Sequence, residues 1–179
     1  MVITRLTTPL QIDSVSVECS NGIIGMSQCP GRIAVNAIEG SRDRDLDADL
    51  KEICDWGASA LVTLMEKEEM EWLGVADLPD KAIQIGLEHY HLPIMDMDIP
   101  DEQFEYRWKT AGESLRKLLL SDQSIVIHCL AGLGRTGTVA ARLLVELGAE
   151  PETAIRQIRM ARPGTIQTIM QEAYLRRIK

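Results

Sequence analysis

The sequence predicts an α/β fold in which a central, mainly parallel sheet is flanked by helices. Short apolar runs with the length and branching of buried strands alternate with segments of helical periodicity, and the connections between them are short. Such alternation is typical of parallel sheets covered by helices. In addition, the apolar run at 125–127 leads through a glycine-containing loop directly into a helix-like stretch. Because ligands of parallel sheets sit at the carboxyl ends of the strands, this loop marks the expected ligand-binding edge.

The length of 179 residues fits a single domain, which we expect to span 1–179. A chain of this size buries roughly 70% of its unfolded surface, so its core needs no disulfide or metal to hold it together. Residues 1–21 are polar and β-branched, and we expect them to form an extended segment packed on the domain rather than a core element.

Glycine, proline and capping residues divide the rest of the chain into elements. The expected strands lie at 21–32 (a short strand ending in a turn), 59–65, 89–94 and 124–128. The expected helices lie at 43–56, 66–74, 79–87, 104–120, 135–147, 151–162 and 165–178. Helices are expected to end at Gly57, Gly74 and Gly148, and Asp101 and Thr165 are the expected N-terminal caps of two others. We interpret the acidic run at 66–71 as a solvated helix face.

The charge balance argues against two classes of partner. Lys and Arg total 19 and Asp and Glu total 27, which gives a net charge of −8. Nucleic acids and anionic membrane surfaces require a basic face, so neither is an expected partner. The sequence has no apolar run of ~18 residues and no apolar signal-peptide core at its start, and we expect a cytoplasmic protein.

The cysteines and histidines give no sign of a metal site. The four cysteines form no CxxC pair and show no metal-ligand spacing with the three histidines, so we expect neither a metal nor another cofactor. Reduced thiols are expected in a chain of this length without a secretion signal. Cys29 is expected to have a packing role.

The stretch SIVIHCLAGLGRTGT at 124–138 has the parts needed to bind an oxyanion against a thiolate. At a junction between strand and helix, the positive potential of the helix N-terminus lowers the pKa of a cysteine such as Cys129 from ~8.5 toward ~3.5–7.5. The expected phosphate-binding groups are the backbone amides of Leu130, Ala131, Gly132, Leu133, Gly134 and Arg135. Arg135 offers a planar fork to two phosphoryl oxygens. Thr136 can hydrogen-bond the sulfur, and His128 is expected to tune Cys129 and order the loop rather than act as a base.

Read together, these positions form the pattern HCxxGxGRTG, by which the chain resembles the protein tyrosine phosphatase superfamily. The segments PIMDMDIPD at 93–101 and GTIQTIMQEAYL at 164–175 extend the resemblance to the kinase-associated subgroup of dual-specificity phosphatases. The resemblance can be followed over roughly 22–178. It implies a protein tyrosine phosphatase-like fold of dual-specificity size and a metal-independent hydrolysis of phosphomonoesters through a phosphocysteine intermediate.

A leaving oxygen departs slowly unless it is protonated, so a carboxylic acid is also required. The candidates are Asp96, Asp98 and Asp101, of which Asp101 is explained by its capping role. In similar phosphatases the acid follows a Pro-Ile-x triplet, which corresponds to Asp96. The family usually has glycine after the acid, whereas this chain has Met97, and Asp98 therefore remains an alternative.

The same resemblance implies a glutamine that positions water for breakdown of the intermediate. Gln167 and Gln171 match the family's glutamine motif, and Gln167 is the better candidate. The alternative is that both glutamines simply face solvent on a helix and position no water.

The expected substrate is a phosphorylated protein or peptide, carrying phosphotyrosine, phosphoserine or phosphothreonine. Lipid-directed relatives usually carry lysines inside the loop, whereas Leu130, Ala131 and Leu133 are uncharged. The alternatives are a catalytically weak phosphoprotein-binding module, a phosphatase for a non-protein phosphomonoester, and a sulfur-transfer domain of rhodanese type. The sequence does not predict the oligomeric state.

Overall fold

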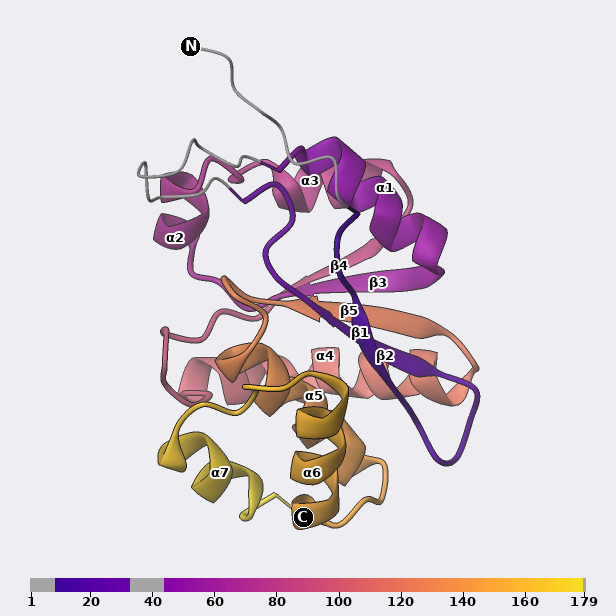
Figure 1. Ribbon diagram of the computed structural model, residues 1–179, viewed down its shortest axis with the longest axis vertical. Helices are drawn as coiled ribbons and strands as arrows, with labels where there is room; N and C mark the ends of the chain where they lie inside the picture. Colours follow the sequence, from indigo (N-terminus) through magenta and orange to yellow (C-terminus); the bar gives the residue numbers. More distant parts are fainter. Residues whose placement is uncertain (1–8, 33–43, 179) are drawn as a thin grey trace.

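The computed structural model describes residues 9–32 and 44–178 (Figure 1). Within these ranges the strands are β1 (Asp13–Ser16), β2 (Ile23–Ser27), β3 (Ala58–Thr63), β4 (Glu88–His91) and β5 (Ser124–His128). They form one sheet in the order β1-β2-β5-β3-β4. β2, β5, β3 and β4 are parallel, and β1 pairs antiparallel with β2. The prediction of a mainly parallel α/β sheet is confirmed.

Helices cover both faces of the sheet (Figure 1). They are α1 (Leu46–Trp56), α2 (Lys67–Trp72), α3 (Leu78–Gln84), α4 (Glu102–Leu120), α5 (Gly134–Glu146), α6 (Pro151–Ala161) and α7 (Ile169–Leu175). α1 and α3 lie on one face, and α4 to α7 lie on the other. The central strand β5 is therefore shielded on both sides, and Ile125, Val126 and Ile127 are each 0% exposed. A strand buried on both faces reads as a continuous apolar run, which is why the sequence located it.

The N-terminal segment differs from the prediction. Its residues 1–8 lie outside the described part of the chain, but β1 is a strand of the sheet rather than a segment packed across it. An edge strand needs only one hydrogen-bonding neighbour and one covered face. Asp13–Ser16 accordingly alternates between half-buried and exposed residues and contains few apolar ones, so its sequence did not predict a strand of the sheet.

The end of the chain also differs. Thr165 does not cap the last helix but donates its hydroxyl to the Arg162 carbonyl at 2.9 Å. Ile166 has a left-handed backbone with φ 55°, so the chain turns before Thr168, which caps α7 together with Gln171. Sequence spacing did not reveal this turn because a β-branched residue rarely adopts positive φ.

Other boundaries agree more closely. Asp101 caps α4 by accepting the Phe104 amide at 2.7 Å, and Gly57 ends α1 with φ 102°. β4 and α3 both end earlier than expected. α3 ends at Gln84 because Gly86, with φ 96°, turns the chain out of the helix. Among the described residues, no helix is long and apolar enough to span a membrane.

Candidate active site

The loop at 129–133 joins β5 to α5 at the carboxyl edge of the sheet, where the sequence placed the reactive cysteine. Cys129 is 3% exposed, and Gly134 begins α5. Gly132 has φ 71°, and a Cβ atom there would lie 2.2 Å from the carbonyl oxygen of Ser27 at the end of β2. Only glycine combines this backbone with so close an approach. The loop therefore packs directly against the end of the neighbouring strand β2.

Every carbonyl oxygen from Cys129 to Leu133 accepts a hydrogen bond. The donors are His128 Nδ1 to Cys129, the Cys29 amide to Leu130, Arg162 Nη2 to Ala131, Arg162 Nε to Gly132 and the Gly137 amide to Leu133. The N–H and C=O of one peptide point in opposite directions, so holding the carbonyls turns the amides toward the inside of the loop. This arrangement agrees with the anion nest that the sequence predicts, which stays a prediction.

Arg162 is a residue that the sequence analysis did not single out. Its guanidinium reaches the loop from the end of α6, with Nε 2.7 Å from Gly132 O and Nη2 3.1 Å from Ala131 O. Its Nη1 atom pairs with Asp13 Oδ2 of β1 at 2.5 Å. The edge strand that sequence reasoning set aside therefore anchors the loop.

Arg135 lies in the first turn of α5 and is 1% exposed. Its Nη1 and Nη2 atoms donate to the two carboxylate oxygens of Glu69 at 2.7 and 2.9 Å, and Nη1 also donates to Ile94 O at 3.0 Å. Burial by itself would lower the pKa of this guanidinium, but Glu69 together with the charges of Cys129 and Asp96 outweighs burial and raises it. Arg135 is held as a fixed cation.

The solvated-face interpretation of the acidic run is wrong for Glu69. Its side chain is only 21% exposed, and its Oε2 atom also accepts the Glu66 amide at 2.9 Å. Glu69 and Arg135 are 66 residues apart in sequence, so only the fold brings them together.

Asp96 is brought to the loop, and Asp98 has other contacts. Asp96 Oδ1 lies 3.0 Å from Arg135 Nη2, although the Asp96 side chain is 59% exposed. Asp98 Oδ1 accepts the adjacent Ile99 amide at 2.8 Å. Between them, Met97 takes the left-handed conformation with φ 64° at the position where the family usually has glycine. The departure from the family pattern thus leaves a glycine-like turn in place.

The two candidate glutamines are placed differently. Gln171 is 0% exposed, accepts the Gln167 amide at 2.8 Å and donates Nε2 to Asp98 O at 3.1 Å. Gln167 is exposed, and its Oε1 atom lies 2.7 Å from where a Cβ on Gly134 would be. Gln171 therefore joins α7 to the Asp96 loop, and Gln167 lies beside the start of α5.

His128 is fully buried and lies between two hydrogen-bonding groups. Its Nε2 atom is 2.7 Å from Thr63 Oγ1, and its Nδ1 atom is 3.4 Å from Cys129 O. Burial lowers the pKa of His128 to about 3, so the ring is neutral at working pH and only weakly basic, which agrees with the expectation that it orders the loop rather than acting as a base. Burial, with a smaller contribution from Cys129, raises the pKa of Cys29 to about 12, which keeps that thiol protonated beside the loop.

Three buried side-chain atoms at the site have no hydrogen-bond partner among the described residues. They are Ser27 Oγ, Arg135 Nε and Thr136 Oγ1. Buried polar atoms nearly always have partners in folded proteins. Two of these three belong to residues that the sequence assigned to phosphate and sulfur.

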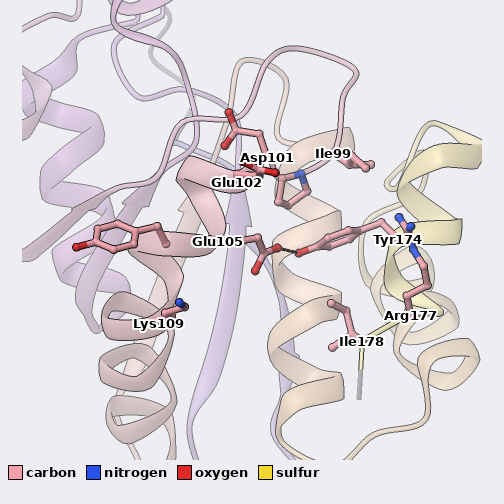
Figure 2. A pocket seen from close by; sticks show the side chains of 10 residues that line it. Ile99, Asp101, Glu102, Glu105, Lys109, Tyr174, Arg177 and Ile178 are labelled. Carbon is pink, nitrogen blue, oxygen red and sulfur yellow. Dashed lines mark hydrogen bonds between the residues drawn. The ribbon is translucent and has the colours of Figure 1, made fainter.

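A network behind the loop fixes α5 against its neighbours. Arg142 donates Nη2 to Glu105 Oε2 of α4 at 2.9 Å and Nε to Glu146 Oε1 at 2.7 Å. Tyr174 of α7 donates to Glu105 Oε1 at 2.8 Å, as Figure 2 shows. The pocket in that view has a volume of about 660 Å³ and lies between α4 and α7. Of the candidate site residues only Asp101, the cap of α4, lines it, and Cys129, Arg135 and Asp96 do not.

Among the described residues there is no cluster of three or more His, Cys, Asp or Glu side chains that could hold a metal ion. The four cysteines, all within the described ranges, are free thiols.

Comparisons with known proteins agree with this geometry. A family model described as "polymorphic toxin system, DSP-PTPase phosphatase" matches residues 38–149. The chain is 32% identical to cyclin-dependent kinase inhibitor 3 of Rattus norvegicus, over 94% of this chain and 78% of that protein. It is 38% identical to a probable protein tyrosine phosphatase type IVA A of Dictyostelium discoideum, over 53% of this chain and 56% of that one.

A solved structure is similar over nearly the whole chain. The crystal structure of kinase associated phosphatase, with its catalytic-site cysteine substituted by serine, superposes with a TM-score of 0.81 at 30% identity, covering 95% of this chain and 94% of that one. The resemblance inferred from the loop and its companion motifs is confirmed. The chain belongs to the cysteine-dependent dual-specificity protein tyrosine phosphatases.

Proposed function

We propose that this chain acts as one phosphatase domain and hydrolyses phosphorylated proteins with Cys129 as the nucleophile. The observation that carries the proposal is a pair of buried atoms, Arg135 Nε and Thr136 Oγ1, that have no hydrogen-bond partner among the described residues. They lie at the start of α5, directly after a loop whose carbonyls all accept hydrogen bonds. A phosphoryl group in the loop would hydrogen-bond the first atom, and the Cys129 sulfur would hydrogen-bond the second.

In the first step the Cys129 thiolate attacks phosphorus, forming the S–P bond as the bond from phosphorus to the leaving oxygen breaks. Asp96 gives its proton to that oxygen. In the second step water attacks phosphorus, the S–P bond breaks, Asp96 takes the proton of the water, and Thr136 stabilises the returning thiolate. Gln167, beside the start of α5, would orient the water, with Gln171 holding the segment in place.

Arg135 links substrate binding to the acid. Its guanidinium donates to the Glu69 carboxylate, and its Nη2 atom also pairs with the Asp96 carboxylate. A phosphoryl dianion that engages Nε and Nη2 would displace the Asp96 carboxylate from the guanidinium. The displaced side chain, which is 59% exposed, can then take up a proton from solvent and reach the leaving oxygen as a carboxylic acid.

The surroundings of the site favour a protein substrate. Exposed apolar side chains lie on the Asp96 loop and at the start of α7, two segments joined by the bond from Gln171 to Asp98 O. They are Met95 (62%), Met97 (50%), Ile169 (84%) and Met170 (57%). Such side chains suit the residues flanking a phosphorylated side chain better than a highly charged lipid head group. A reducing compartment such as the cytoplasm would keep the nucleophile as a thiol.

The test is turnover of p-nitrophenyl phosphate and of phosphopeptides. We expect vanadate-sensitive hydrolysis by the native chain and a loss of at least about 10³-fold in Cys129→Ser, with an unchanged melting temperature. We expect a higher kcat/KM for phosphotyrosine or phosphothreonine peptides than for inositol phosphates. Turnover retained in Cys129→Ser would overturn the mechanism, and a preference for inositol phosphates would overturn the substrate class.

A further inference from the structure

A line of hydrogen bonds crosses three strands and ends at the reactive cysteine. Thr63 Oγ1 on β3 is 2.9 Å from His89 Nε2 on β4 and 2.7 Å from His128 Nε2 on β5. His128 Nδ1 is 3.4 Å from the carbonyl oxygen of Cys129. Thr63 and His128 are paired across the sheet, and both are 0% exposed. The line therefore runs from a half-buried histidine through the core to the loop.

The chemistry of the groups allows one direction of donation. A carbonyl oxygen only accepts, so the proton of the neutral His128 ring must be on Nδ1, which leaves Nε2 as an acceptor. The Thr63 hydroxyl then gives its single hydrogen to His128 Nε2. Its remaining lone pairs accept from His89, whose proton must lie on Nε2.

Both rings are held in the neutral form that this direction requires. Burial lowers the pKa of His128 to about 3, with smaller effects from His89, Arg135 and His91. Burial, followed by His91, lowers the pKa of His89 to about 4, and Asp80 opposes this weakly. Neither histidine gains a proton in the range in which a thiolate would work.

We propose that Thr63 and His89 are positioning residues that fix the tautomer of His128 so that its Nδ1–H holds the Cys129 carbonyl. The inference rests on the proposed function. Neither residue touches substrate. Their effect passes through His128, which draws the negative end of the Cys129 carbonyl away from the sulfur and turns the following amide into the loop.

The consequence is a more stable thiolate at Cys129. Without the Thr63 hydroxyl, His128 is free to place its proton on Nε2, and a bare Nδ1 then faces the carbonyl. The peptide loses its donor, and the thiolate loses part of its stabilisation. The other charged or titratable groups around the thiol are Arg135 with its partners Glu69 and Asp96, and Cys29. None of these contacts Thr63 or His89 among the described side-chain hydrogen bonds.

The experiment measures the pH dependence of iodoacetamide alkylation at Cys129, followed by mass spectrometry of the peptide that carries it. Thr63→Val removes the hydroxyl at constant shape, and we expect it to raise the thiol pKa by about one unit. Thr63→Ser restores the hydroxyl and should return the native value. Because the readout needs no turnover, a failure of the proposed hydrolysis and a failure of this inference are distinguishable.

Substitutions of His89 test the proposal independently if Thr63→Val does not fold. His89→Phe removes the donor, whereas His89→Gln keeps an N–H group at the end of the side chain. His91→Phe is the matched control, because His91 lies on the same strand and bonds Met65 O instead, at 2.7 Å. We expect a raised thiol pKa in His89→Phe alone. A native thiol pKa in folded Thr63→Val, or equal shifts in His89→Phe and His91→Phe, would overturn the proposal.

Discussion

The cysteine loop, taken together with the start of α5 (129–135), and the acid loop at 95–101 meet at Arg135 but are built in opposite ways. In the first, all carbonyls from Cys129 to Leu133 are held, and most residues are buried. In the second, Met95 to Asp98 are exposed, and the loop is tied down mainly by Gln171 and by the pair between Asp96 and Arg135. A nest for a developing charge must be rigid before the reaction begins, whereas an acid that serves two steps must move.

Loss of the acid in the acid loop should lower kcat most for a substrate with a poor leaving group. We expect Asp96→Asn to lower kcat for a phosphothreonine peptide by about 10³-fold, because an alkoxide cannot leave without a proton. The loss should shrink with p-nitrophenyl phosphate, whose leaving group is already stable as an anion. Steady-state kinetics with both substrates measures the difference.

Asp98→Asn is the matched control for this change. Within the described ranges, the Asp98 side chain bonds only the neighbouring Ile99 amide, and the link of Asp98 to Gln171 runs through the main chain, so we expect a loss below about threefold. If instead Asp98→Asn showed the leaving-group dependence and Asp96→Asn did not, the roles of the two carboxylates would be exchanged.

The cysteine loop should respond in the same way to every substrate. Arg162→Met keeps the apolar stem but removes the guanidinium that holds Ala131 O and Gly132 O. We expect kcat/KM to fall by about 10²-fold for p-nitrophenyl phosphate and for phosphopeptides alike, since the nest serves the transition state whatever the leaving group.

Arg156→Met, on the exposed side of the same helix, should change kcat/KM by less than about twofold. A loss in Arg162→Met that depended on the leaving group would remove the distinction between the two loops.

The same contrast explains what the sequence could predict. Cys129, its loop and Arg135 lie within one short stretch whose residue types are fixed by local chemistry, and the adjoining strand is apolar at 125–127. The predicted junction of strand, loop and helix is present in the structure. Asp96 was separable from Asp98 only through family resemblance, and its contact with Arg135 agrees with that assignment.

The supporting residues could not be found in this way. Glu69 and Arg162 each reach the loop from another element, 66 and 30 residues away from their partners. Charged residues on helices are usually solvated, so nothing in their local sequence marks them. The turn at Ile166 was missed for a different reason, because a left-handed β-branched residue contradicts local preference and persists only through tertiary contacts.

The smallest expected effect lies at Met97, whose φ is close to that of Gly132. Gly132 has φ 71° with a carbonyl oxygen 2.2 Å from its would-be Cβ, whereas Met97 has φ 64° and is 50% exposed. In Met97→Gly the relief of left-handed strain and the added freedom of the unfolded chain oppose each other, so the free energy of unfolding should change by less than about 1 kcal/mol. Urea unfolding measures this, and p-nitrophenyl phosphate turnover should stay within about twofold. A larger change in either quantity would mean that the acid loop is held as tightly as the cysteine loop, and that the side chain of Met97, rather than its backbone, positions Asp96.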